Sequence, residues 1–521
     1  MTSSMSSQNV PRPGRPGSRR ADRRHVRRRA TALGGLLLIV VAILAVTGGF
    51  DDGPPVIVAR VGGPAAAPPI PNSFVGLSME YQAAEAYTGP NSSDVDPVFE
   101  QLIRNLTPGQ DPVLRIGGDS TDHTWVPTPG VARSPGVYYA LTPDWLASVG
   151  ALAHELDARL ILGIDLEADS TTLASAEANA LVNAVGADHV QGLEIGNEPS
   201  LYGSLAWYTA PGGRFVNGRP FSYDLADYVS EFTRFARVLP AVPLAGPALG
   251  SYVWMGGLGT LLSAEPSLKE VTFHRYPFDR CGTRPGSPRY PTVRKLLKAR
   301  ASDGLAETLA PYVQVARARG VAFRLDELGS VACAGSWGVS NTFASSLWML
   351  DTLFAMARIG VAGVNVHTFP RAAYEPFTVT DSGGRWSASI EPDYYGMLMF
   401  VQAAPPGSQL LKISTGSRVV RAWATRGTAG VTRVVLINSS LTRKVDVVVR
   451  LPRSVRRGWL ERLRGPSAYA TSGVSLGGRS FPASTYTGVL PGPPHTTAVM
   501  PSGGSYRVSL PPTSAALLTV P

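Results

Sequence analysis

Cysteine is scarce in this chain. Only Cys281 and Cys333 occur among its 521 residues, which excludes a small disulfide-rich scaffold. Two thiolates without histidines at short spacing also do not make a zinc site. Two possibilities remain at this point. One is a single disulfide, which would contribute roughly 4 kcal/mol in the chain-entropy model; the other is a pair of unbonded, buried thiols.

Several common motifs are missing as well. No GxGxxG or P-loop sequence follows a predicted strand, which argues against a nucleotide-binding open sheet. The seven histidines include no HExxH pair and no Ser-His-Asp signature of a peptidase. The sequence therefore predicts no metal and no organic cofactor.

Net charge is small outside one short segment. The total is +10, but residues 1–30 hold nine Arg and one Asp, so +8 of it lies there and only +2 is left for the rest of the chain. A nearly neutral body argues against nucleic acid as a partner. The basic character belongs to an amino-terminal tail, residues 1–29.

An uncharged, hydrophobic run follows this tail, from Ala30 to Phe50. As a helix it would be about 30 Å long, enough to cross a bilayer. The arginines would hold the tail in the cytoplasm and place everything after residue 50 outside. We therefore expect a single-pass anchor in the cell membrane. The alternative is a cleaved signal peptide, which would leave a secreted protein.

Two regions with different composition and hydrophobic patterning follow. Residues 51–72 are rich in Pro, Ala and Gly and are expected to form a linker with one strand, Val56–Arg60. Across residues 73–402, eight strand-like runs alternate with helical patterns such as Pro143–Leu156, Tyr223–Val238 and Asn341–Ile359. This alternation predicts an α/β fold, the (β/α)8 TIM barrel. The expected strands are Phe74–Met79, Val113–Ile116, Leu160–Ile164, Gly192–Ile195, Pro243–Ala245, Val271–His274, Phe323–Leu325 and Gly363–His367.

Residues 403–521 contain short strand-like runs separated by Gly, Ser and Pro, with no long helical pattern. This pattern predicts a carboxy-terminal all-β sandwich domain, which the strand Val56–Arg60 would complete. The expected strands are Arg418–Ala424, Thr432–Asn438, Lys444–Val449, Tyr506–Leu510 and Ala515–Val520.

Two glutamates lie at the carboxyl ends of predicted strands, where barrel enzymes have their catalytic residues. Glu198 follows the fourth strand in Gly196-Asn197-Glu198-Pro199, and Glu327 ends the seventh. Carboxylates at these positions can approach to about 5–5.5 Å, the spacing of a retaining glycoside hydrolase. We expect Glu198 to be the acid/base and Glu327 the nucleophile. The alternative is that both are surface residues at strand ends.

Neighbouring polar residues are further candidates. Asn197 is expected to hydrogen-bond a sugar 2-hydroxyl, a contact that strengthens in the transition state. Glu194 and Asp326 flank the pair and are weaker candidates, and Glu194 would also fit as an internal barrel residue. Arg115 lies within a strand and is expected to neutralise buried carboxylates.

Five motifs in this order resemble glycoside hydrolase family 79, the heparanase-like β-glucuronidases of clan A. The resemblance covers roughly residues 72–521. The motifs are Phe74-Val75-Gly76-Leu77-Ser78-Met79-Glu80, Leu114-Arg115-Ile116-Gly117-Gly118-Asp119-Ser120, Gly196-Asn197-Glu198-Pro199, His274-Arg275-Tyr276-Pro277 and Ser340-Asn341-Thr342-Phe343.

The resemblance implies a sugar that carries a carboxylate. Main-chain N–H groups of Cys333, Ala334 and Gly335 are expected to hold this carboxylate together with Tyr374, although some members of the family have consecutive glycines in the loop. The resemblance also places Cys281 and Cys333 on adjacent loops of the barrel mouth, so we expect a disulfide that pins the carboxylate-binding loop.

The same resemblance suggests roles for four residues at other strand ends. Tyr276 is expected to donate a hydrogen bond to Glu327 and keep it ionised. His274 would lie beside the nucleophile, either in the site or as an ordinary core histidine. Glu80 and Asp119 are expected to bind sugar hydroxyls.

These features together predict an exo-acting, retaining β-glucuronidase that acts on extracellular glycans or glycoconjugates. Two alternatives remain: a clan A glycosidase for a neutral sugar, and a non-catalytic carbohydrate-binding protein of the cell envelope. Because both glutamates and Asn197 are present, the sequence favours a working enzyme.

Overall fold

The computed structural model describes residues 54–452 and 456–521. The described residues belong to one compact unit, residues 54–521. The predicted basic tail and membrane anchor lie outside the described residues. Within the described part, no helix is both long and apolar enough to cross a bilayer.

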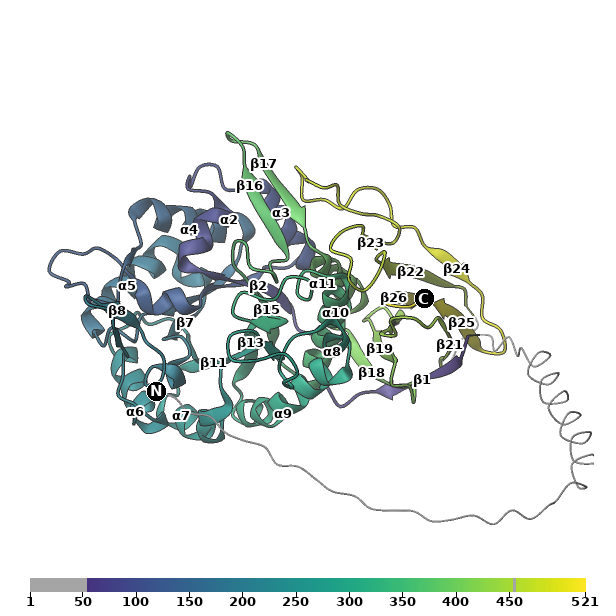
Figure 1. The fold of residues 1–521 in the computed structure, drawn as a ribbon, viewed down its shortest axis with the longest axis horizontal. Coiled ribbons are helices and arrows are strands. Elements are labelled where there is room, and N and C mark those ends of the chain that lie inside the picture. The colour runs from purple at the N-terminus through teal and green to yellow at the C-terminus, as the bar shows by residue number, and fades with distance from the viewer. Residues whose placement is uncertain (1–53, 453–455) are drawn as a thin grey trace, which may run out of the picture. The chain divides into compact units, whose positions relative to one another are not determined.

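Eight parallel strands form a closed barrel, as the sequence predicts (Figure 1). Its order around the barrel follows the chain, and β10 pairs with β7 on one side and β11 on the other. Nearly every barrel residue is buried, because helices cover the outer face and side chains fill the inside. The barrel strands are β2 (Val75–Glu80), β3 (Val113–Gly117), β6 (Arg159–Ile164), β7 (Val190–Ile195), β10 (Leu244–Leu249), β11 (Leu268–Arg275), β13 (Ala322–Leu328) and β15 (Gly363–Thr368).

Helices connect these strands, and local sequence signals set their ends. In α4 the Thr142 side chain accepts from Trp145 N at 3.1 Å, and Pro143 occupies the first turn, where its missing N–H costs nothing. The longer helices are α3 (Pro97–Leu106), α4 (Pro143–Leu156), α5 (Thr171–Val185), α6 (Leu225–Ala236), α9 (Asp303–Arg317), α10 (Phe343–Ile359) and α11 (Pro392–Ala403). The shorter ones are α2 (Ala84–Thr88), α7 (Leu258–Ala264), α8 (Val293–Leu296) and the 3-10 helices η1 (Tyr81–Ala83), η2 (Asp119–His123), η3 (Ala187–His189), η4 (Pro199–Leu201), η5 (Tyr252–Gly257) and η6 (Ala299–Ala301).

A ten-stranded sheet forms the second domain. Strands from both ends of the hydrogen-bonded strand order contribute to one apolar core, as the two sheets of a sandwich do. The strands are β1 (Val56–Pro64), β18 (Gln409–Ser414), β19 (Val420–Arg426), β20 (Thr432–Asn438), β21 (Val445–Arg450), β22 (Gly458–Arg464), β23 (Ser475–Leu476), β24 (Thr497–Val499), β25 (Ser505–Leu510) and β26 (Ser514–Val520). Short two-stranded sheets are separate from both large sheets: β4 (Thr124–Trp125) with β5 (Tyr139–Ala140), β8 (Tyr208–Ala210) with β9 (Arg214–Val216), β12 (Phe278–Asp279) with β14 (Val331–Ala332), and β16 (Phe377–Asp381) with β17 (Trp386–Ile390).

Strand β1 comes from the segment predicted as a linker. It runs parallel to β21 and antiparallel to β18, and Ala59 and Val61 are buried in the core of the sheet domain. The amino-terminal end of the described chain is therefore tied into the carboxy-terminal domain before the barrel begins.

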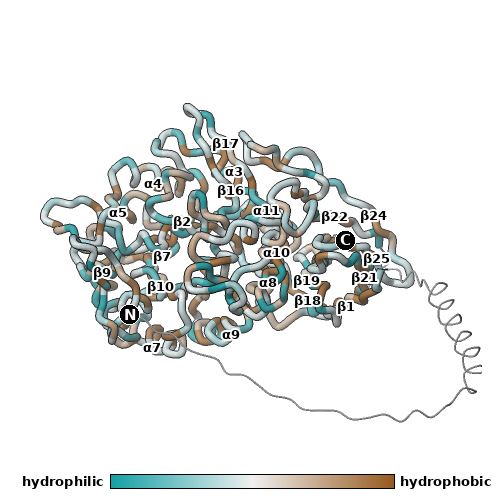
Figure 2. The backbone as a smooth tube through the Cα atoms, in the orientation of Figure 1, coloured by the Kyte–Doolittle hydropathy of each residue, from teal (hydrophilic) through white to brown (hydrophobic). Residues whose placement is uncertain are grey.

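Helix α10 joins the two domains. It is buried over most of its length, whereas an ordinary barrel helix exposes one face. Phe354 stacks on Trp423 of β19 with ring centroids 5.5 Å apart, and Asp351 accepts from the Trp423 indole N–H at 2.7 Å. Hydrophobic residues line the elements between the barrel and the sheet, while the outer loops are largely hydrophilic (Figure 2).

A chain that begins at Ala66 should be much less stable than one that begins at Pro54. It loses β1, which removes Ala59 and Val61 from the core and leaves β18 and β21 without their shared partner. We expect the free energy of unfolding to fall by roughly 3 kcal/mol or more. Thermal unfolding followed by circular dichroism would measure it. Equal melting temperatures for the two chains would contradict the structural role of β1.

Candidate active site

The two predicted catalytic glutamates meet at the carboxyl end of the barrel. Glu198 follows β7 and Glu327 lies near the end of β13; each has a carboxylate oxygen within 4.8 Å of the other's and of a His274 ring nitrogen. This spacing matches retaining rather than inverting glycosidases, which need room for a water between the carboxyl groups.

A strained turn sets the position of Glu198. Its φ is 50°, in the left-handed region, and its backbone N–H donates to Ala248 O at 2.9 Å. Gly250, just after β10, makes room for the side chain: a Cβ there would lie 2.0 Å from Glu198 Oε1. A larger residue at position 250 would displace the carboxylate of Glu198.

Arg115 is the centre of the buried network. Its Nη1 donates to Glu327 Oε2 at 2.9 Å, and its Nε lies 2.7 Å from Glu194 Oε2 and 3.0 Å from Asp326 Oδ2. Burial alone would lower the pKa of Arg115, but the three carboxylates more than reverse this and raise it well above its usual value. The predicted neutralising role is therefore observed, and it extends to the nucleophile itself.

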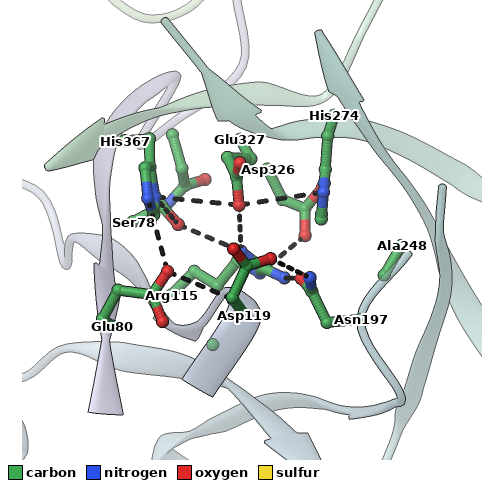
Figure 3. A network of polar contacts seen from close by, with 12 residues as sticks. Ser78, Glu80, Arg115, Asp119, Asn197, Ala248, His274, Asp326, Glu327 and His367 are labelled. Carbon is green, nitrogen blue, oxygen red and sulfur yellow. Dashed lines mark hydrogen bonds and ion pairs between the residues drawn. The ribbon is translucent and has the colours of Figure 1, made fainter. Parts of the chain in front are cut away.

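Glu327 lies between two histidines (Figure 3). Its Oε2 is 3.7 Å from Nδ1 of both His274 and His367, and Tyr276 donates its hydroxyl to Oε1 at 2.8 Å. Burial would raise the pKa of Glu327. The interactions of Glu327 with His367, His274 and Arg115 and the Tyr276 hydrogen bond outweigh burial and hold the pKa of Glu327 below its ordinary range. Glu327 is thus ionised at neutral pH, as a nucleophile must be.

His274 contacts both glutamates. Its Nδ1 lies 3.1 Å from Glu198 Oε1, and Nε2 is 3.8 Å from Asp326 Oδ1. Burial lowers the pKa of His274, but Glu327, Asp326 and Glu198 raise it to about 9 overall, against the opposing charge of Arg115. A protonated imidazole therefore lies between the two catalytic candidates, which makes His274 part of the site.

Asn197, Asp119 and Glu80 form the rim on the other side of the nucleophile. Asn197 accepts from Arg115 Nη2 at 3.0 Å and donates to Asp119 Oδ1 at 3.3 Å. The carboxylate of Glu80 accepts from the backbone N–H of Asp119 at 3.1 Å and from that of Ser120 at 2.8 Å. These contacts fix the orientation of the rim, and sugar binding by the three residues stays a prediction.

Asp119 itself is exposed at the mouth. Desolvation by the surrounding rim and the charges of Glu80, Glu198 and Glu327 raise its pKa, to about 8, while its carboxylate keeps contact with water. It is therefore the group on the rim whose charge state changes most easily near neutral pH.

The predicted carboxylate-binding loop has an unusual backbone. Cys333, Ala334 and Gly335 all have positive φ, of 65°, 61° and 79°, although only glycine adopts this region without strain. Ala334 O accepts from Ala373 N at 2.8 Å, which holds the loop beside Tyr374. The predicted disulfide between Cys281 and Cys333 is confirmed, with 6.1 Å between the Cα atoms. The disulfide supports the strained turn covalently.

Tyr374 faces the same side of the site. Its ring centroid lies 6.1 Å from that of Tyr276 and 5.8 Å from that of His367. Burial, followed by the charges of Glu327, Glu80 and Asp119, raises the pKa of Tyr374, so its hydroxyl stays protonated and can donate.

Two residues of the site were not predicted from the sequence. His367 lies near the end of the eighth barrel strand, β15, and contacts Ser78 Oγ at 3.2 Å as well as Glu327. Asp122 accepts from the backbone N–H of Asn197 at 3.0 Å and from the Tyr202 hydroxyl at 2.7 Å, so it orients the segment that carries Glu198. The sequence offered one signal for His367, because a polar residue at the end of a barrel strand is a candidate site residue. It offered no such signal for Asp122.

A cavity of about 170 Å³ opens beside Glu198. Trp207 forms one wall, and its indole N–H donates to Asp122 O at 2.7 Å. His123 stacks on Trp207 with centroids 6.3 Å apart and on Tyr138 at 4.7 Å. This aromatic wall lies on the acid/base side of the site, where a leaving group would depart.

The side chains of Glu198, His274 and Glu327 also have the donor types that hold a cation. In this structure, however, Arg115 and Tyr276 already bond to the two oxygens of Glu327, and the pKa of His274 favours its protonated form. The donor set therefore fits proton transfer better than metal ligation.

Comparisons with known proteins agree with this geometry. No family model matches the chain. It is 23% identical over 408 residues to a β-glucuronidase of Aspergillus niger, covering 72% of each chain. It is 22% identical over 426 residues to a β-glucuronidase of Neurospora crassa, covering 72% of this chain and 73% of the relative.

The fold is also found in solved structures. The chain matches a 4-O-α-L-rhamnosyl-β-D-glucuronidase from Fusarium oxysporum 12S with a TM-score of 0.70 and 18% identity, over 89% of this chain and 100% of that one. It matches a family 51 arabinofuranosidase from Xanthomonas axonopodis pv. citri with a TM-score of 0.61 and 15% identity, over 89% and 99%.

The closed barrel, the paired glutamates and these relatives define a glycoside hydrolase. Its similarity to β-glucuronidases, predicted from the sequence motifs, is confirmed.

Replacing Tyr276 with Phe should move the acidic limb of the pH profile of kcat/KM to higher pH. The hydrogen bond from Tyr276 lowers the pKa of Glu327, so losing it raises that pKa and a higher pH is needed to ionise the nucleophile. We also expect kcat/KM to fall about ten-fold or more, since a hydrogen bond to a charged group is lost. Tyr469→Phe, on the exposed surface, is the matched control. An unmoved acidic limb would contradict this role of Tyr276.

Proposed function

We propose that the protein is a retaining, exo-acting β-glucuronidase that removes terminal glucuronic acid from extracellular glycans or glycoconjugates. One observation carries the mechanism: two carboxylates approach within 4.8 Å at the barrel mouth, and one of them is held ionised by Arg115, two histidines and a phenol. The choice of glucuronic acid as the sugar is supported by the relatives, since both are β-glucuronidases.

The first step follows from the geometry. Glu327 attacks the anomeric carbon and forms a covalent glycosyl–enzyme ester, while Glu198 gives a proton to the departing oxygen. The leaving group exits along the aromatic wall formed by Trp207. Asn197, fixed by Arg115 and Asp119, faces the sugar from the rim, where a contact to the 2-hydroxyl would strengthen as positive charge develops.

In the second step, Glu198 removes a proton from water as the water attacks the same carbon. The ester to Glu327 breaks and the sugar leaves with its original β configuration. Release restores the ionised nucleophile. Arg115 and Tyr276 then hold the returning negative charge, as they do in the free enzyme.

Recognition of the glucuronic acid carboxylate is assigned to the loop Cys333–Gly335 and to Tyr374. The consecutive positive φ values of this loop support the assignment, since neighbouring N–H groups of a tight turn can point to one side and bind an anion. The protonated Tyr374 hydroxyl adds a donor beside it. The disulfide to Cys281 keeps this loop in position without requiring three glycines.

The amino-terminal run Ala30–Phe50 is proposed to anchor the protein in the cell membrane, with the barrel outside. The length of the run and the arginines before it support this topology. Removal of the run by a signal peptidase would give a secreted form with the same barrel.

Substrate class can be tested with a soluble chain that begins at Asp51. We expect hydrolysis of an aryl β-glucuronide and little of the matching aryl β-glucoside. Glu327→Gln should lower kcat by about 10³-fold or more, because the nucleophile is lost. Glu307→Gln, at an exposed position, is the control. Preferential hydrolysis of the glucoside would be consistent with the proposed mechanism but would contradict the proposed specificity for glucuronic acid. Inactivity on both substrates would favour a carbohydrate-binding protein.

The role of Glu198 can be tested separately with Glu198→Ala. An aryl glucuronide with a good leaving group needs little acid assistance, so the covalent ester should still form and then accumulate. Added azide, which needs no general base, should restore turnover and give a β-glucuronosyl azide, identifiable by NMR. An α-configured azide, or no rescue, would contradict the assignment of Glu198 as acid/base.

A further inference from the structure

A second cavity lies outside the active site. Its volume is about 380 Å³, and it is bounded by the end of β11 and the segments around α8, η6 and the start of α9. Five cationic side chains line it, and no lining residue is acidic. The cations are Arg275, Arg289, Lys295, Lys298 and Arg300.

These charges are not neutralised by the protein. Among residues 54–452 and 456–521, none of the five forms an ion pair. Lys295 donates to the carbonyl oxygens of Ser287 at 2.6 Å and Tyr290 at 2.8 Å. The other four cations are therefore the ones most available to an anionic ligand. In a body with a net charge of only +2, this concentration of cations in one hollow is unusual.

Arg275 shows the effect of this crowding. Its guanidinium stacks on the Tyr252 ring at 4.4 Å, and its Nε is buried without a hydrogen-bond partner in the described chain. Burial, together with the nearby charge of Arg289, lowers the pKa of Arg275. A buried donor without a partner costs free energy, which an anionic ligand would recover.

Two acidic residues next to the cavity in sequence, Asp303 and Asp279, have other partners. Asp303 begins α9, but Arg358 lies 3.2 Å from its carboxylate and Arg421 contacts its other oxygen. Asp279 accepts from the backbone N–H groups of Cys281 and Gly282. The start of α9, at Gly304 and Leu305, also borders the cavity and adds the positive end of a 15-residue helix.

The cavity lies at the same end of the barrel as the active site. Arg275 is at the carboxyl end of β11, and α9 begins at this end because it leads back to the start of β13. Along β11, His274 and Tyr276 point into the barrel toward the glutamates, whereas Arg275 between them points outward into the cavity. One strand end therefore separates the two sites.

Size and wall chemistry define the ligand. The volume falls within the range of sites for small organic molecules and exceeds what a single inorganic anion fills. Phe278, Pro277 and Leu305 supply an apolar wall, against which the C–H face of a sugar ring packs, while guanidinium groups bind carboxylates or sulfates through paired hydrogen bonds.

We propose that this cavity binds an anionic saccharide, a sugar unit that carries a carboxylate or a sulfate ester. Its source is either a further acidic unit of the glycan being cleaved or a free acidic saccharide. The proposal goes beyond the glucuronidase activity and does not depend on it, because binding is measured without turnover.

Calorimetric titration with trigalacturonate tests it, with saturating glucuronic acid present to fill the proposed active site. We expect one binding site, weakened about ten-fold or more in Lys298→Ala/Arg300→Ala, since two charge-assisted contacts are lost. Both side chains are exposed, so the variant should fold. Arg294→Ala, exposed on α8 and outside the cavity, should bind like the unmodified protein. Affinity should fall as salt rises.

Three outcomes would overturn the proposal: no binding of trigalacturonate, equal affinity in the double variant, or equal binding of the neutral trisaccharide maltotriose. Kinetics then identify the source. A loss of kcat/KM in the double variant on a glucuronide-capped acidic oligosaccharide, but not on the aryl glucuronide, identifies the glycan being cleaved. Lost binding with both rates unchanged identifies a free saccharide. If the aryl glucuronide is not hydrolysed at all, the proposed function fails while the calorimetry still decides the cavity.

Discussion

The buried guanidinium of Arg115 is the interaction on which the site depends. It bonds to Glu194, Asp326 and Glu327 within 3.0 Å, deep in a barrel that excludes water. Without it, three carboxylates would share one buried volume, and they would have to take up protons or separate. Because the guanidinium also donates to Asn197, it fixes Glu327 and the rim residue Asn197 with one side chain.

The two glutamates proposed as catalytic differ in what surrounds them. Glu327 is enclosed by two histidines, Arg115 and a phenol, all of which favour its charged form. Glu198 lies on a strained turn, is partly exposed, and contacts His274. Two chemically identical groups therefore have different environments, as the proposed double displacement requires.

Strand β11 and the loop that follows it link several functions. His274 and Tyr276 contact the two glutamates, Arg275 lines the basic cavity, and Phe278–Asp279 pairs with Val331–Ala332 just before the turn proposed to bind the substrate carboxylate. The disulfide between Cys281 and Cys333 links the two segments covalently. The proposed active site and the second cavity are therefore built in part from the same short stretch of backbone.

From the sequence alone we could predict the eight barrel strands, the helix Pro143–Leu156, five strands of the sheet domain and the two glutamates that meet at the barrel mouth. These predictions follow from local periodicity, caps and motif spacing, which need no knowledge of distant residues. Three features became visible only in the folded chain: β1 lies between β18 and β21, His367 and Asp122 join the site, and the five cations share one cavity. Those contacts join residues far apart in the chain, and barrel closure and strand register set their distances.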